Sequence, residues 1–312
     1  MKILLTGGAG FIGRNILEHL IDKNRFNITV LDRFDDVRKL IAVAPYQEIE
    51  IADYSAFSLD ERDFDVVIHQ GAISATTEMD AEKLWHNNVR FSLRLAEYCA
   101  ARDKPLIYAS SASVYGVQGD RQSNHHARIE PLNGYGSSKL IVDNLIQHQY
   151  PNLKYFALRY FNVYGRYELD KGDMASPVTK FFLEAKRTGE IRLFAEDKDN
   201  TSTAFSRDFV FVGDICRLID YLIDNCRMIN SSFLDVGTGK ATTFRKIASL
   251  IQDHFGRGVT LKDIPMPASL VGHYQGFTRA DLSTTRLAGY AETPTDIETG
   301  VKETINWLSR VT

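Results

Sequence analysis

The 312-residue chain has an ordinary globular composition, with 44% hydrophobic and 25% charged residues and a formal net charge of −3. This charge provides no basic field for nucleic acid, so we expect no nucleic-acid partner. The cysteines Cys99, Cys216 and Cys226 are scattered without a CxxC pair, so we expect neither a disulfide framework nor a metal site.

The N-terminal segment "KILLTGGAGFIGRNILEHLI", which starts at Lys2, predicts a dinucleotide-binding unit. A short apolar strand runs into glycines and is followed by apolar residues at helical spacing. Gly7, Gly10 and Gly13 have the spacing that allows a tight turn, the approach of a pyrophosphate and close helix–sheet packing. A second strand, "NITVLD", ends in Asp32, where a carboxylate can meet the adenosine ribose. The order of these features favours a bound NAD or NADP.

Strands and helices then alternate, which predicts an α/β fold with a Rossmann doubly wound parallel sheet. The strands expected are "DVVIHQGA", "PLIYASS" and "KYFALRYFNVYG", with a helix over 81–101 and another containing "DNLIQHQ". After Gly165 the alternation loosens, and "YELDKGDMASPV" is typical of a loop. "RDFVFVGDICRLIDYLI" and "SSFLDVGTG" indicate a return to the sheet.

This pattern predicts two parts. The first is an NAD(P)-binding Rossmann domain over residues 1–165, with return segments near 208–238. The second is a smaller C-terminal α/β substrate lobe made of 166–207 and 239–312. No apolar run is long enough for a signal peptide or a membrane span, so a cytoplasmic protein without a membrane partner is expected. Apolar residues on the helix over 81–101 and on the Tyr135 helix suggest a homo-oligomer.

Within "PLNGYGSSKL", Tyr135 and Lys139 are four residues apart and share one helix face. A free phenol has a pKa of about 10, and a nearby ammonium together with an oxidised nicotinamide ring should favour the phenolate. Tyr135 can then accept a hydroxyl proton while hydride leaves the same carbon. Ser111, at the end of the strand in "YASSASVYG", can orient that hydroxyl. The alternative is a surface tyrosine with a neighbouring lysine.

These residues resemble the extended short-chain dehydrogenase/reductase family, a group of Rossmann enzymes that modify nucleotide sugars. The segments "GAISATTEMD", "PLNGYGSSK", "LRYFNVYG", "KGDMAS" and "GHYQGFTRADL" resemble the ADP-L-glycero-D-manno-heptose 6-epimerases among them. The resemblance covers essentially the whole chain. It implies an epimerase that oxidises and re-reduces its nucleotide-sugar substrate, with ADP-heptose as the expected substrate, through a tightly bound cofactor.

Carried over position by position, the resemblance implies two groups of site residues. Besides the three glycines, Tyr135 and Lys139, cofactor contacts are implied at Phe11, Ile12, Asp32, Arg33, Lys39, Gln70, Gly71, Ala72, Ser74, Asn87 and Val163. Substrate contacts are implied at Ser111, Asn162, Lys171, Lys180, Phe194, Arg207 and Tyr274. We add Asp173, which stands where these epimerases commonly have serine and places a carboxylate near the sugar or diphosphate.

Lys171 of "KGDMAS" matches a second catalytic acid/base. One base on one face of a carbon cannot serve both stereochemical outcomes, so an epimerase of an exocyclic centre needs a second proton carrier. In a heptose, C6 lies outside the ring, and local rotation can present either face. The alternative for Lys171 is a solvated loop lysine.

The residues leave the nucleotide and the exact reaction open. Asp32 suits a ribose hydroxyl and therefore NAD, whereas Arg33, Arg38 and Lys39 suit a 2′-phosphate; we follow the family towards NADP. A UDP-hexose 4-epimerase or another nucleotide-sugar epimerase or reductase would share the fold, as would a non-catalytic NAD(P)-binding protein. A 4,6-dehydratase would carry an Asp-Glu pair where this chain has Ala112 and Ser113.

Overall fold

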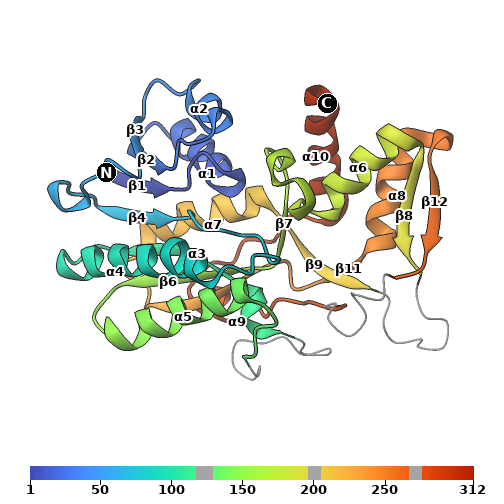
Figure 1. The fold of residues 1–312 in the computed structure, drawn as a ribbon. Coiled ribbons are helices and arrows are strands. Elements are labelled where there is room, and N and C mark those ends of the chain that lie inside the picture. The colour runs from blue at the N-terminus through green and yellow to red at the C-terminus, as the bar shows by residue number, and fades with distance from the viewer. Residues whose placement is uncertain (117–128, 196–204, 267–275) are drawn as a thin grey trace.

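The computed structural model describes residues 1–116, 129–195, 205–266 and 276–312 (Figure 1). Its largest element is a seven-stranded sheet in the order β10-β6-β5-β4-β1-β2-β3, with parallel pairings throughout. The strands are β1 (Lys2–Thr6), β2 (Asn27–Asp32), β3 (Glu50–Asp53), β4 (Val66–His69), β5 (Leu106–Ser111), β6 (Tyr155–Tyr160) and β10 (Ser232–Val236). The expected Rossmann sheet is confirmed, with β1 at the point where the strand order reverses.

Helices cover both faces of this sheet because successive strand residues point to opposite sides. In β1, Ile3 and Leu5 pack with the helices α1 and α7, whereas Leu4 packs with α4 and α5. The helices that accompany the large sheet are α1 (Phe11–Asp22), α2 (Val37–Val43), α3 (Ala81–Leu84), α4 (Phe91–Ala101), α5 (Gly134–Gln149), α7 (Val212–Asn225) and α9 (Ser283–Leu287). Shorter turns are η1 (Leu59–Glu61), the π-helical η2 (Trp85–Arg90) and η3 (Ala112–Tyr115).

The chain leaves the large sheet at Phe161, whose N–H donates to the carbonyl of Val236 at 3.0 Å. "KYFALRYFNVYG" is expected to form one strand, and this expectation is wrong. β6 ends at Tyr160, and β7 (Asn162–Tyr164) joins a separate three-stranded sheet with β9 (Ser206–Phe211) and β11 (Ala241–Thr243). The sequence also indicates a return to the large sheet at "RDFVFVGDICRLIDYLI" and "SSFLDVGTG". Only the second of these supplies a strand to it, β10, whereas β9 lies in the three-stranded sheet and the following α7 packs beside α1. Aromatic and β-branched residues of strand character stand before and after the break, in "YFNVY", and hide it.

A second group of elements stands at the opposite end of the molecule from β3 (Figure 1). It consists of η4 (Leu169–Met174), α6 (Pro177–Thr188), β8 (Glu190–Phe194), α8 (Phe244–Phe255), η5 (Gly256–Gly258), β12 (Thr260–Ile264) and α10 (Ile297–Val311). β8 and β12 pair in parallel, and a core that includes Val178, Phe182, Ile247 and Ile305 holds the helices together. Across the part of the chain that the structure describes, no helix combines the length and apolarity needed to cross a membrane.

Candidate active site

The glycine turn after β1 is tightly packed at two of its three glycines. A Cβ on Gly7, whose φ is +70°, would lie 2.5 Å from the amide nitrogen of Gly71. A Cβ on Gly13 would lie 2.0 Å from the carbonyl oxygen of Gly7. Gly10 directly precedes α1, and its Cβ would meet only the Gly7 oxygen, at 3.3 Å. The turn therefore leaves its open space at the N-terminus of α1, where backbone N–H groups fit the pyrophosphate of a dinucleotide.

Several residues expected to contact the cofactor gather at the end of β2. Asp32 Oδ1 accepts a hydrogen bond from Lys39 Nζ at 2.8 Å, and Oδ2 accepts one from the N–H of Ala9 in the glycine turn at 3.1 Å. Arg33 Nη1 donates to Asn87 Oδ1 at 3.1 Å. Asp32 therefore ties β2 to the glycine turn, and Lys39 neutralises its charge.

Gln70, Gly71, Ala72 and Ser74 follow β4 along the same edge of the sheet. Tyr160 donates its hydroxyl hydrogen to Gln70 Oε1 at 2.9 Å. Gln70 Nε2 is buried and has no hydrogen-bond partner among residues 1–116, 129–195, 205–266 and 276–312. A buried donor without an acceptor is costly, and a bound nucleotide can supply the acceptor. The residues present fit a dinucleotide.

The helix α5 carries Tyr135 and Lys139. Its first turn is capped by Asn133, whose side chain accepts the N–H of Gly136 at 2.8 Å. The Tyr135 hydroxyl lies close enough to Ser111, at the end of β5, for the serine hydroxyl to lower the phenol's pKa. Lys139 is 4% exposed, and its Nζ lies 5.9 Å from the centre of the Tyr135 ring. The three residues that the sequence connects are therefore brought together.

The expected effect of Lys139 on Tyr135 is not seen in the protein alone. Burial raises the pKa of the Tyr135 phenol, and the Ser111 hydroxyl opposes that rise. The Lys139 ammonium instead donates to the carbonyl of Ala109 at 2.8 Å. Burial lowers the pKa of Lys139 to about 8, against the field of Asp143. An oxidised nicotinamide bound beside Tyr135 would add positive charge that favours the phenolate.

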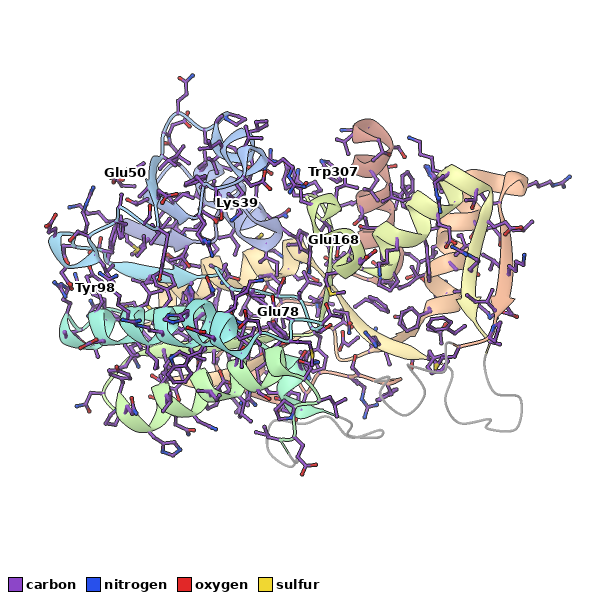
Figure 2. All side chains as sticks on the ribbon, in the orientation of Figure 1. Lys39, Glu50, Glu78, Tyr98, Glu168 and Trp307 are labelled. Carbon is purple, nitrogen blue, oxygen red and sulfur yellow. The ribbon has the colours of Figure 1, made fainter. Side chains whose placement is uncertain are left out.

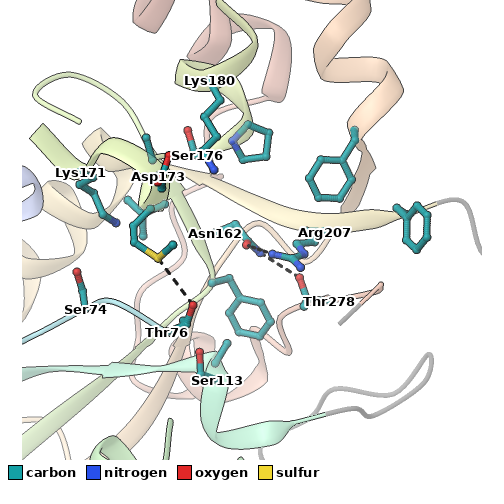
Figure 3. Close-up of a pocket in the computed structure, with 18 of the residues that line it drawn as sticks. Ser74, Thr76, Ser113, Asn162, Lys171, Asp173, Ser176, Lys180, Arg207 and Thr278 are labelled. Atoms are coloured by element: carbon teal, nitrogen blue, oxygen red, sulfur yellow. Dashed lines mark hydrogen bonds between the residues drawn. The ribbon is translucent and has the colours of Figure 1, made fainter. Parts of the chain in front are cut away.

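A cavity of about 940 Å³ lies between the large sheet and the second group of elements. The expected site residues that line it are Ser74, Ser111, Asn162, Val163, Lys171, Asp173, Lys180, Phe194 and Arg207 (Figure 3). Tyr135 and Lys139 do not line the cavity themselves. Ser111, which lies beside Tyr135, does. Tyr274 lies outside the described residues.

Lys171 stands on η4, where the sequence predicts a loop. Gly172 has φ 50° and ψ −121°, a conformation that favours glycine, and it kinks the turn directly after the lysine. Lys171 Nζ lies 5.6 Å from the centre of the Phe11 ring, so this lysine approaches the first residue of α1. Burial lowers the pKa of Lys171, and the carboxylate of Glu168 opposes that change. Lys171 is therefore not a solvated loop lysine.

Arg207 faces the cavity and not Asp208. Arg207 Nη1 donates to Asn162 Oδ1 at 3.4 Å, and Asn162 Nδ2 donates to Thr278 Oγ1 at 3.2 Å (Figure 3). The buried carboxylate of Asp208 accepts the N–H groups of Thr238, Gly239 and Ala280. Alternation along β9 sends the two neighbouring side chains to opposite faces. The two side chains therefore form no ion pair with each other.

The sequence does not reveal four further residues of the site. Glu168, Arg192 and Arg245 line the cavity. Arg192 is held by Glu184, and Arg245 by Asp263, each at 2.5 Å. A charged residue on an isolated strand or helix start gives no sign of facing a cavity, because most such residues face solvent.

The fourth is Asn88, beside the expected Asn87. Asn88 is fully buried in the π-helical η2, and its Nδ2 donates to the carbonyl of Ile73 and to Ser138 Oγ, both at 3.0 Å. It thereby joins the segment after β4 to α5. The expected helix over 81–101 is present, but with this π segment inside it. π-Helical segments are frequent at functional sites. In the sequence, this one is marked only by the adjacent Asn87 and Asn88.

The chain matches the model of the NAD dependent epimerase/dehydratase family over residues 3–236. It is 40% identical to the ADP-L-glycero-D-manno-heptose-6-epimerase of Alkalilimnicola ehrlichii over 321 residues, covering 99% of this chain and 97% of that protein. The solved ADP-L-glycero-D-manno-heptose-6-epimerase of Helicobacter pylori is similar, with a TM-score of 0.84, 28% identity and coverage of 99% and 96%. A UDP-N-acetylglucosamine 4-epimerase of Methanobrevibacter ruminantium shares the fold, with a TM-score of 0.83, 23% identity and coverage of 100% and 99%.

Gly10→Ala and Gly13→Ala should have different effects. The methyl group at Gly13 collides with backbone, so it should lower the free energy of unfolding by about 1–3 kcal/mol. The methyl group at Gly10 meets little protein, so it should leave unfolding nearly unchanged while weakening dinucleotide binding. Urea unfolding and nucleotide titration of both variants measure these effects. Equal losses of stability would contradict the separate roles.

Proposed function

Because the chain belongs to the NAD-dependent epimerase/dehydratase family, we propose that it is an ADP-glycero-manno-heptose 6-epimerase. The observation that carries this proposal is the shared cavity. Ser111, the partner of Tyr135, lines it from β5, and Lys171 lines it from η4. Two separate proton carriers around one substrate site are what inversion of an exocyclic carbon requires.

A bound dinucleotide would supply the hydride acceptor and donor for the substrate carbon. Ser111 and the Tyr135 hydroxyl hold the substrate hydroxyl, and Tyr135 takes its proton as the C–H bond breaks. The product of this step is a ketone at C6. Lys139, with its Nζ fixed by the carbonyl of Ala109, keeps positive charge beside the phenolate.

Lys171 serves the other epimer. After the C5–C6 bond rotates, the ketone presents its second face, and hydride returns there. Lys171 donates the proton that completes the new hydroxyl, and it accepts that proton in the reverse direction. Burial favours the neutral amine, which is the form that can accept a proton.

The nucleotide end of the substrate is proposed to lie near Arg207 and Lys180. A planar guanidinium binds two oxygens of a diphosphate at once, and Asn162 holds this one in place. Asp173, exposed at the cavity wall, is proposed to contact the sugar hydroxyls and to disfavour additional anionic groups there.

We also propose that the two lobes bind different ligands. Residues 1–165 and the return near 208–238 would bind the cofactor, and 166–207 with 239–312 would bind the sugar nucleotide. A homo-oligomer is part of the proposal, because Trp85 and Ile141 are 48% and 38% exposed on the helical layer next to β4 and β5.

We propose NADP as the resident nucleotide, with Arg33 and Lys39 turning from carboxylates to its 2′-phosphate. Denaturation of the purified protein should release NADP. Arg33→Ala and Lys39→Ala should weaken NADP binding more than NAD binding. Arg62→Ala, an exposed arginine paired with Glu50, is the control and should affect neither. Release of NAD, with equal losses for both nucleotides, would assign NAD instead.

Tyr135→Phe should lower turnover of ADP-heptose by ~10²–10⁴-fold, the usual contribution of a general acid/base. The ring is kept, so unfolding and nucleotide binding should stay close to those of the wild type. Tyr150→Phe, at the C-terminal end of the same helix, should keep full activity. Steady-state epimerisation followed by product analysis measures both, and near-normal turnover by Tyr135→Phe would remove this residue from the mechanism.

Lys171→Met separates the 6-epimerase from a UDP-hexose 4-epimerase. The variant keeps much of the side-chain bulk but carries no proton, so 6-epimerisation should fall by about 10²-fold or more while ADP-heptose still binds. Reduction of the bound nucleotide should become unequal for the two starting epimers, and Tyr135→Phe should unbalance it in the opposite sense.

Lys186→Met, on the last turn of α6, is the matched control and should be active. If Lys171→Met epimerises ADP-heptose robustly, the two-base assignment fails. If it turns over UDP-galactose and not ADP-heptose, the 4-epimerase replaces our proposal.

A further inference from the structure

Glu168 is a carboxylate buried at the wall of the substrate cavity, directly before the turn that carries Lys171. Its side chain is fully buried, yet the residue lines the cavity. Oε1 accepts the N–H of Ser176 at 2.6 Å, and Oε2 accepts the hydroxyls of Ser176 and Thr179, both at 2.7 Å. Figure 2 shows Glu168 in the region between α1 and α6. The carboxylate therefore anchors the start of η4 to the start of α6.

These three donors favour the ionised form of Glu168. The N-terminus of α6, which is 12 residues long, carries partial positive charge and stabilises an anion there. Burial is the largest effect and leaves the pKa of the carboxyl above its usual value, although the Ser176 hydroxyl, the charge of Lys171, the Thr179 hydroxyl and the Ser176 N–H oppose that rise. Both oxygens of this buried carboxylate accept hydrogen bonds, as buried polar groups in folded proteins do, so the arrangement is a specific feature of the fold.

Lys171 is held to the same residue through the backbone. Its N–H donates to the carbonyl of Glu168 at 3.0 Å, which closes one 3₁₀ turn. Side chains three residues apart on such a turn lie on the same side. Gly172 then kinks the turn, and Lys171 Nζ lies 5.6 Å from the centre of the Phe11 ring.

The remaining charged groups around Lys171 are more exposed. Asp170 and Asp173 stand on its own turn and are exposed. On α2, Arg38 lies 3.6 Å from Asp170, and on α6, Lys180 is exposed. Water screens these groups, whereas the field of Glu168 acts through buried protein.

We infer that Glu168 is a positioning residue for Lys171: its carboxylate holds the lysine's turn against α6 and supplies the negative charge that keeps the amine able to carry a proton. The inference rests on the two-base function proposed above and adds a residue to it. Without this charge the buried amine would lose its proton too readily and could not donate to the ketone oxygen.

The direction of the effect follows from the charges. Glu168 favours the protonated lysine, so removing its charge should lower the pKa of Lys171. The Lys171-dependent half-reaction should then shift to lower pH, by about one pH unit. The Tyr135-dependent half-reaction, on another element, should keep its pH profile.

Glu168→Gln tests this, because the amide keeps the size of the side chain and the hydroxyls of Ser176 and Thr179 can reorient towards it. The amine is titrated directly by competitive labelling with acetic anhydride and mass spectrometry, which needs no turnover. The midpoint of Lys171 labelling should move to lower pH in Glu168→Gln and return towards the wild-type value in Glu168→Asp. Asp170→Asn, on the same turn and exposed, should leave it unchanged.

The second measurement is reduction of the bound nucleotide by each epimer in a single turnover across pH. A shift confined to the half-reaction that Lys171→Met abolishes supports the inference. An unchanged labelling midpoint in Glu168→Gln overturns it, even where Lys171→Met is inactive and the two-base function stands. If Lys171→Met is active while the labelling midpoint shifts, the proposed function fails and the Glu168–Lys171 coupling survives.

Discussion

The buried carboxylate of Asp143 is the constraint on which the geometry of the site depends. It is fully buried on α5 and accepts hydrogen bonds from Tyr108 at 3.0 Å, Ser110 Oγ at 2.9 Å and Arg159 Nη2 at 3.1 Å. These partners belong to β5 and β6. Since an unpaired buried charge costs several kcal/mol, α5 has one favourable position on this sheet. That position sets Tyr135 and Lys139 of α5 near Ser111 at the end of β5, and it places Lys139 one helical turn from the carboxylate.

Lys139 and Lys171 have a common electrostatic arrangement. Lys139 is followed by Asp143 four residues later, and Lys171 is preceded by Glu168 three residues earlier. In both cases burial lowers the pKa of the amine and the buried carboxylate raises it. Desolvation alone would leave neutral amines, and the carboxylate alone would leave fixed cations. At both amines the two effects therefore oppose each other.

The sequence predicts the features that are local. The glycine turn, the Tyr135–Lys139 face and the alternation of the large sheet each depend on spacings within one or two elements, and the structure contains all three. The break after β6 could not be predicted, because "YFNVY" around Phe161 has the aromatic and β-branched residues typical of a strand, and only the contact of Phe161 with β10 reveals the break. Glu168 could not be predicted for a similar reason. An acidic residue in a polar loop indicates solvent exposure, and its burial depends on α6, a later element whose packing no local pattern reports.

The turn that bears Lys171 is anchored to the cofactor side as well as to α6. Asn15 of α1 donates to the carbonyl of Arg166 at 2.9 Å. The next residue, Tyr167, packs edge-to-face on Trp307 of α10, with ring centres 5.2 Å apart. With α1, α6 and α10 all holding this segment, η4 has little freedom to swing across the cavity between half-reactions. In the proposed 6-epimerisation, inversion would then come from rotation of the substrate carbon between Tyr135 and Lys171. A carbon outside the sugar ring can rotate in this way while its nucleotide stays bound, whereas a ring carbon would need the whole sugar to turn over.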